Sequence, residues 1–116
     1  MSEPLIYNLC RQGDWDAALA EGAYRGSADD RRDGFIHFST AAQVAESAAR
    51  HRAGVADLLL LTVEAARLGD ALRWEASRGG QLFPHLHAPL AVASVLRVDR
   101  LPLGPDGRHV FPRLAG

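Results

Sequence analysis

The chain has 116 residues, of which 47% are hydrophobic and 23% are charged, and its formal net charge at pH 7 is −1. That length fits one domain with one hydrophobic core, and the single cysteine, Cys10, excludes an internal disulfide and a cysteine-based zinc site. The near-neutral charge argues against nucleic-acid binding. The sequence has no apolar run of about 20 residues and no signal-peptide pattern, so we expect no membrane association. These features predict a single cytoplasmic domain over residues 1–116.

The first predicted elements are a strand and a helix. Residues 5–10 alternate in the manner of a strand. Asp14 then has the right position to cap a short helix, and Gly22 has the right position to end it. The buried stripe expected at helical spacing is Trp15, Ala18 and Leu19.

A charged segment and a second helix follow. Residues 26–34 are bracketed by glycines and rich in charge, which predicts a surface loop. Residues 35–38 resume as a short strand. Thr40 and Gln43 have the spacing of a capping box, which predicts a helix that ends at Gly54. The small-residue face expected on this helix is Ala41, Val44, Ala45 and Ala48.

The second half of the chain is predicted to consist mainly of short strands. Residues 58–63 form the most apolar run and predict a central strand buried on both faces. The other expected elements are a strand over 72–75 with Leu72 and Trp74 inward, a turn over 78–80, an extended segment over 83–89, a strand over 95–101, and a turn over 105–107 within a final hairpin or tail over 102–116. Together these elements predict an α+β fold, with a compact mixed or antiparallel split sheet and two short helices.

Two segments carry residue types suited to anion or nucleotide binding. His37, Ser39 and Thr40 lie where a strand passes into a helix N-terminus, and exposed N–H groups there favour anions. Ser39 and Thr40 could equally cap the helix, with His37 as a hydrogen-bonded strand residue.

The second segment is Trp74–Gly80. Glu75 could stabilise a cationic transition state, Ser77 and Arg78 could hold a phosphate, and Gly79 could let the backbone approach a ligand closely. A glutamate paired with a neighbouring arginine before an ordinary glycine turn is the alternative.

Two histidines in the extended segment suggest a third possibility. His85 and His87 are two residues apart, so both rings point to one side of an extended chain. With His37 as a third ligand they could form a metal site. The leading interpretation needs no metal.

The order of several short motifs resembles the domain of unknown function 952 family. Leu-Ile-Tyr, Asp-Trp and Tyr-Arg-Gly-Ser precede the two most specific blocks, which lie at residues 33–40 and 74–86. The resemblance runs from about Leu5 to Asp99. It implies a fold similar to that of ADP-ribosyltransferases, with a cleft for NAD.

The resemblance also implies roles for residues. The ligand would be NAD or an ADP-ribose-like nucleotide, and His37, Glu75 and His85 would act in ADP-ribosyl transfer or cleavage of the glycosidic bond of NAD. Arg25 or Arg78 would hold the pyrophosphate. The family tends to carry a basic residue where this chain has Asn8, which supports the alternative of a non-catalytic ligand-binding module on the same fold.

Overall fold

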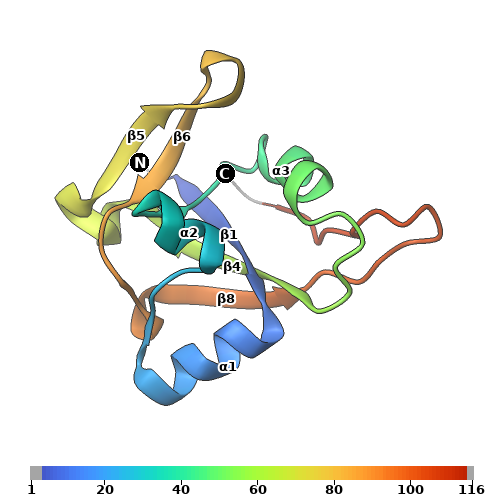
Figure 1. The fold of residues 1–116 in the computed structure, drawn as a ribbon, viewed down its shortest axis with the longest axis horizontal. Coiled ribbons are helices and arrows are strands. Elements are labelled where there is room, and N and C mark those ends of the chain that lie inside the picture. The colour runs from blue at the N-terminus through green and yellow to red at the C-terminus, as the bar shows by residue number, and fades with distance from the viewer. Residues whose placement is uncertain (1–3, 115–116) are drawn as a thin grey trace.

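A three-stranded antiparallel sheet in the order β1-β4-β8 lies at the centre of the fold (Figure 1). β1 spans Leu5–Arg11, β4 spans Leu58–Glu64 and β8 spans Val95–Arg100. The computed structural model describes residues 4–114, without the side chain of Arg78. All of residues 58–63 are buried, because β4 has a strand on each side and packing on both faces. The prediction of a central buried strand is confirmed.

Two further antiparallel sheets complete the β-structure. β3 (Ile36–His37), β6 (Leu82–Leu86) and β5 (Leu72–Ala76) form one sheet, and β2 (Ala23–Tyr24) pairs with β7 (Leu90–Ala91) in the other. The α+β class and the division of the sheet are confirmed. Every pairing between the described strands is antiparallel, so the mixed alternative is not observed.

A backbone bridge joins the β3 sheet to the central sheet. The backbones of Tyr7 and Ser39 exchange two hydrogen bonds, from each N–H to the other carbonyl oxygen, both 2.8 Å long. Ser39 lies two residues beyond the end of β3, and Tyr7 lies within β1. This bridge fixes the residues after His37 against the central sheet.

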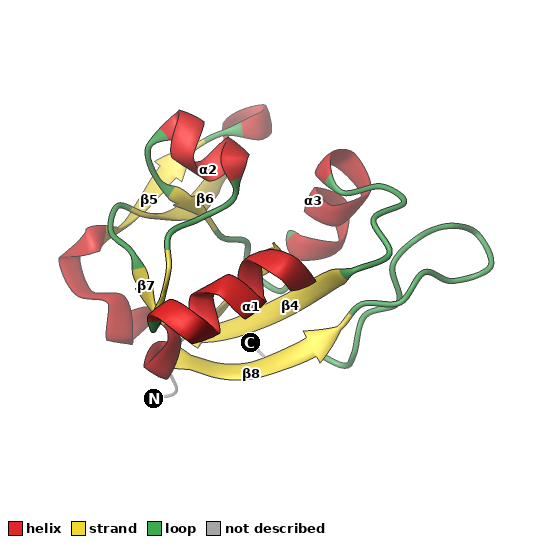
Figure 2. Cartoon of the chain, turned by 60° about the horizontal axis from the view of Figure 1, so that its bottom comes forward, coloured by secondary structure: helices red, strands yellow, loops and turns green. Residues whose placement is uncertain are grey.

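The described chain has three α-helices where two were predicted. They are α1 (Gln12–Glu21), α2 (Ala28–Asp33) and α3 (Val44–His51), and 3-10 turns lie at Ala65–Ala71, Arg78–Gly80 and Val92–Ser94. α1 contacts β1 and β2, and its buried residues Trp15 and Ala18 join the core on one face of the central sheet (Figure 2). It begins two residues before Asp14, which lies in the first turn and does not cap the helix. Its end at Gly22 is confirmed, with φ at 90°.

The prediction that residues 26–34 form a loop is wrong, because α2 occupies most of that segment. Ser27 and Asp30 form a reciprocal capping box in which each side chain accepts from the other's backbone N–H. Gly34, with φ at 88°, ends the helix, and its N–H donates to the carbonyl of Asp30. Burial of Asp30 ties the helix to the body of the protein, since only 4% of this residue is exposed.

Helix α3 is shorter than predicted. It ends at His51, three residues before Gly54. Half of the predicted capping box is present, because the Gln43 side chain accepts from the Thr40 N–H at 3.1 Å. Ala45, which was expected on the buried face of this helix, is exposed. Ser47 lies on the buried face instead, with Val44 and Ala48.

Two side chains expected inside lie outside. Leu19 is 53% exposed and Trp74 is 42% exposed. Trp74 lies opposite Pro84 in the β5–β6 pair, on the outer strand of its sheet. The burial of Trp15 and Ala18 is confirmed.

The C-terminal segment returns to the body of the protein as a loose hairpin. A bridge pairs Leu103 with His109, and the Gly104 N–H donates to the Arg108 carbonyl at 2.7 Å, which confirms the predicted turn. His109 Nε2 lies 2.7 Å from the Val55 carbonyl. No helix within residues 4–114 is long and apolar enough to cross a membrane.

Candidate functional site

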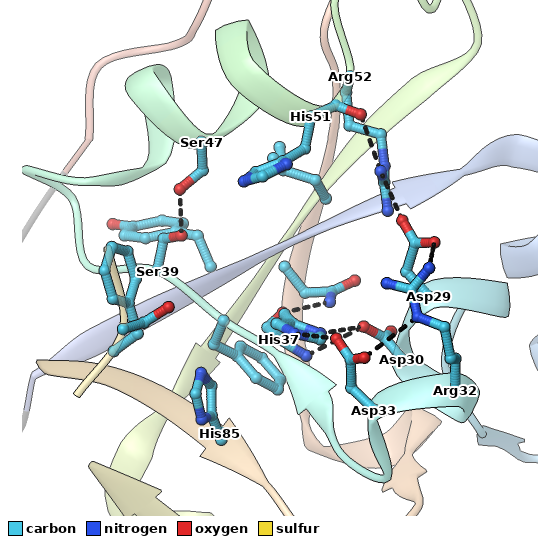
Figure 3. Close-up of a pocket in the computed structure, with 16 residues that line it drawn as sticks. Asp29, Asp30, Arg32, Asp33, His37, Ser39, Ser47, His51, Arg52 and His85 are labelled. Atoms are coloured by element: carbon cyan, nitrogen blue, oxygen red, sulfur yellow. Dashed lines mark hydrogen bonds and ion pairs between the residues drawn. The ribbon is translucent and has the colours of Figure 1, made fainter. Parts of the chain in front are cut away.

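A cavity of about 300 Å³ lies between β1, β6, α2 and α3, and we call it cavity A (Figure 3). α3 contributes Ser47 and His51 from one side, and α2 contributes its acidic residues from the other. The residues that line cavity A are Tyr7, Asn8, Leu9, Asp29, Asp30, Arg32, Asp33, His37, Phe38, Ser39, Ser47, His51, Arg52, Ser77, Phe83 and His85.

His37 is held between two carboxylates of α2. Its Nδ1 lies 2.6 Å from Asp30 Oδ1, and its Nε2 lies 3.2 Å from Asp33 Oδ2. Each ring nitrogen of His37 thus lies within hydrogen-bond distance of a carboxylate oxygen, a group that accepts hydrogen bonds. The backbone N–H of His37 also donates to Asp30 Oδ1, at 3.2 Å. Asp30 therefore fixes both the backbone and the ring of His37.

Asn8, in β1, contacts the backbone of His37 and has one polar side-chain atom without a partner among the described residues. Its Nδ2 donates to the His37 carbonyl at 2.8 Å. Its Oδ1 is buried and accepts no hydrogen bond from the described residues, although the residue is only 2% exposed. A buried carbonyl-type oxygen without a donor is costly. Asn8 lines cavity A, although this oxygen itself has almost no exposed surface.

Glu75 binds two histidines, one in β6 and one just after the end of β6. Its Oε1 lies 2.8 Å from His85 Nδ1 and 2.9 Å from His87 Nε2. Those two hydrogen bonds lower the pKa of Glu75, with the bond from His87 contributing most. Burial lowers the pKa of His85, and the bond to Glu75 partly opposes this effect. His85 is therefore neutral near pH 7, with the proton on Nδ1 and a lone pair on Nε2.

Phe35 joins the two histidine groups. Its ring stacks on that of His85 with centroids 4.0 Å apart, and it lies at a tilt 4.6 Å from His37 and 5.1 Å from His87. The rings of His37 and His85 meet edge to face, 5.4 Å apart. One aromatic side chain thus fixes the relative positions of three imidazoles.

Hydroxyl groups and cations line the side of cavity A near α3. The hydroxyls of Ser39 and Ser47 lie 3.0 Å apart. Arg52 donates to the His51 carbonyl at 2.8 Å and lies 3.4 Å from Asp29. Polar groups of both charges therefore converge on this cavity, as expected of a site for a polar small molecule.

A second cavity, of about 280 Å³, lies on the other side of Asp30, and we call it cavity B. The residues that line cavity B are Arg25, Asp30, Arg31, Gly34, Phe35, Ile36, Leu86, His87, Ala88 and Pro89. Arg25 forms a 2.5 Å ion pair with Glu21. Arg25, which was expected beside the pyrophosphate, thus lines cavity B and does not line cavity A.

The predicted site residues separate into groups. His37, Ser39, Ser77 and His85 line cavity A. Glu75 contacts His85 without lining the cavity.

Thr40 and Gly79 line neither cavity. Gly79 has φ at 63° with open space around it, so its glycine serves the turn geometry. The side chain of Arg78 lies outside the described part of the structure. The structure places His37 and His85 together at cavity A, and it adds Asp30, Asp33, His51 and Arg52, which were not among the predicted site residues.

The histidines are not arranged as the metal hypothesis requires. His37 faces the carboxylates of α2, while His85 and His87 face Glu75. Within residues 4–114, no group of three or more His, Cys, Asp or Glu side chains has a geometry that could hold a metal ion.

Comparison with known proteins gives one family and one set of solved structures. The family described as Protein of unknown function (DUF952) matches residues 9–98. The crystal structure of protein CC0527 from Caulobacter crescentus is 51% identical, with a TM-score of 0.89, and the match covers 91% of this chain and 93% of that one. The solution NMR structure of CC0527 is 52% identical, with a TM-score of 0.81, and 90% of each chain is covered. No curated protein matches the chain.

Proposed function

The chain belongs to the DUF952 family of proteins of unknown function, and we propose that this member binds a nucleotide of the NAD or ADP-ribose type in cavity A. The unpaired Oδ1 of Asn8 carries the proposal, because a buried acceptor without a donor is costly and a turn of the Asn8 side chain, which lines cavity A, would bring it to a donor on a ligand. Ribose hydroxyls and a carboxamide N–H are donors of the required kind. The nucleotide class itself comes from the family resemblance.

The size of cavity A limits what it encloses. Its volume of about 300 Å³ lies at the lower end of the range for small-molecule sites. One ribose together with its attached base or phosphate fits such a volume, whereas a whole dinucleotide extends beyond it. The proposed ligand therefore places one half inside cavity A and leaves the other half outside.

The charges around cavity A suit a phosphorylated ribose. Arg52 is mostly buried and lies 3.4 Å from Asp29, while Arg32 is exposed and pairs with Asp29 and Asp33. Arginine forks bind phosphate well, and these long ion pairs can exchange a carboxylate for a phosphate oxygen. The carboxylates of α2 can in turn accept from ribose hydroxyls.

His85 is the group in this cavity best suited to accept a proton. Its ring is neutral near pH 7, and Glu75 holds the proton on Nδ1, so Nε2 has a free lone pair. In cleavage of NAD, the bond between C1′ of the ribose and the nicotinamide nitrogen breaks, and nicotinamide leaves with the electron pair. Water then attacks C1′ and gives its proton to His85 Nε2. Glu75 positions His85 in this step and does not touch the ligand.

One observation favours a second candidate, a binding module without turnover. Glu75 does not line cavity A, and its carboxylate is engaged by two histidines. A late glutamate that stabilises an oxocarbenium ion must face the ribose. In the second candidate the same cavity binds the nucleotide, and His85 only supports the wall through Phe35.

A thermal-shift series with NAD, ADP-ribose, AMP and nicotinamide tests the proposal. A ligand at ten times its Kd stabilises by about 1.4 kcal/mol, which raises the Tm by about 5 °C in a domain of this size. We expect that rise with NAD or ADP-ribose and its loss in Asn8→Leu, whereas the exposed Arg50→Ala serves as a matched control. A Tm that no nucleotide changes would contradict the proposal.

Nicotinamide release separates the two candidates. A catalyst loses turnover in His85→Ala while the shift with ADP-ribose persists. A binding module releases no nicotinamide with either protein and keeps the shift in both.

A further inference from the structure

We propose that cavity B is a separate binding site for an organic phosphate or carboxylate, with Arg31 and Arg25 as the groups that hold the anion. Cavity B has about 280 Å³ and a lining that combines two arginines with an apolar wall. The proposal concerns a different cavity from the proposed nucleotide site and stands independently of it.

The charges that face cavity B are unequal. Arg31 is exposed and has no carboxylate within ion-pair distance among the described residues. Arg25 pairs with Glu21 on the outer side. Asp30 is the one carboxylate in the lining, and its oxygens are already engaged by the Ser27 N–H and by His37. The lining is therefore positive toward a ligand, with Arg31 as the cation that is available for a new partner.

The remaining wall of cavity B suits the organic part of such a molecule. Phe35 and Pro89 supply apolar surface next to the arginines, and the buried Ile36 and Leu86 lie behind them in the core. A small cavity that pairs apolar walls with a few charged groups is typical of a site for a small organic ion. Guanidinium groups bind the planar or tetrahedral oxygens of carboxylates and phosphates in two-pronged fashion.

Asp30 and the segment from Phe35 to His37 separate the two cavities. Asp30 lines both, whereas Phe35 and His87 line cavity B, and His37 and His85 line cavity A. An occupant of cavity B therefore touches the aromatic ring on which His85 stacks. A ligand in cavity B would lie close enough to influence the histidines without entering the nucleotide site.

The test titrates inorganic phosphate, phenyl phosphate and benzoate, at constant ionic strength, into isotopically labelled protein followed by NMR. We expect chemical-shift changes at residues 31–36 and 86–89, with phenyl phosphate binding more tightly than inorganic phosphate because it also covers the apolar wall. Arg31→Ala should weaken phenyl phosphate binding about five-fold, and Arg31→Glu by more, whereas Arg50→Ala should leave it unchanged. Arg31 and Arg50 are both exposed, so neither change threatens the fold.

Two outcomes would overturn the proposal. One is shift changes at every exposed arginine alike, with affinity equal in wild type and Arg31→Glu. The other is shift changes confined to the lining of cavity A. Asn8→Leu keeps the two proposals apart, because it should abolish the nucleotide-induced rise in Tm and leave phenyl phosphate binding intact.

Discussion

Replacing Asp30 by alanine should destabilise the protein far more than the same change at Asp29, its neighbour in α2. Asp30 caps the helix through the Ser27 N–H at 2.9 Å, and its loss there costs about 1 kcal/mol. It also accepts from the partly buried His37 N–H, which contributes about another 1 kcal/mol. The ion pair with the half-exposed His37 ring is screened by solvent and adds about 1 kcal/mol at most.

The expected loss is therefore about 3 kcal/mol, or a fall in Tm of about 12 °C. Asp29 is about half exposed and makes two ion pairs of 3.4 Å, so Asp29→Ala should lower the Tm by about 2 °C or less. Asp30→Asn, which keeps an acceptor for the Ser27 N–H, should fall between the two. Calorimetry at pH 7 measures all three. Equal Tm values for Asp30→Ala and Asp29→Ala would refute the role assigned to Asp30.

Three other features lead to predictions. Because Glu75 raises the pKa of His85 against the lowering effect of burial, Glu75→Gln should move the NMR titration midpoint of His85 to lower pH, and an upward movement would contradict the assignment. The pKa of His85 is lower in the folded protein than in the unfolded chain, so neutral His85 favours the folded state. This contribution to the free energy of unfolding is complete above the pKa of the unfolded state and is lost as the pH falls through the pKa of the folded state, which urea denaturation at several pH values would detect. Leu60→Ala, in the middle of β4, should cost about 3 kcal/mol in urea denaturation, whereas the exposed Leu19→Ala should cost about 0.5 kcal/mol or less; similar losses would argue against the packing described. Burial raises the pKa of Cys10 to about 12, so its thiol should react with an aromatic disulfide reagent at pH 8 only after unfolding, and rapid labelling of the folded protein would contradict its burial.

The regular core could be predicted from the sequence because its patterns are local. The run from Leu58 to Val63 has no polar residue except Thr62, and its place between β1 and β8 follows from that composition. The end of α1 could likewise be predicted, from the position of Gly22. The pattern of residues 72–75 is misleading, since Trp74 is apolar and still 42% exposed, on the edge strand β5 of the three-stranded β3-β6-β5 sheet.

The α2 segment shows where composition and local signal disagree. Its charges suggested a solvated loop, yet Ser27 and Asp30 have capping-box spacing and Gly34 has the position of a C-terminal glycine. Those signals could have identified the helix. The burial of Asp30 could not be predicted in this way, because it depends on a tertiary contact with His37.

The candidate site was predicted in part for the same reason. His37 and His85 were singled out by their motifs, and the structure brings them together through Phe35. His51 and Arg52 carry no motif, and they reach cavity A only because α3 packs across it. The unpaired oxygen of Asn8 is a property of packing, so no sequence pattern indicates it.

A crystal structure of the protein with ADP-ribose tests the central claim most directly. We expect the ligand to occupy cavity A and to place an O–H or N–H donor within about 3 Å of Asn8 Oδ1. We also expect its phosphate to lie toward Arg52, on the side of α3. Ligand bound elsewhere on the surface, with Asn8 Oδ1 still without a donor, would contradict the assignment of cavity A as the nucleotide site.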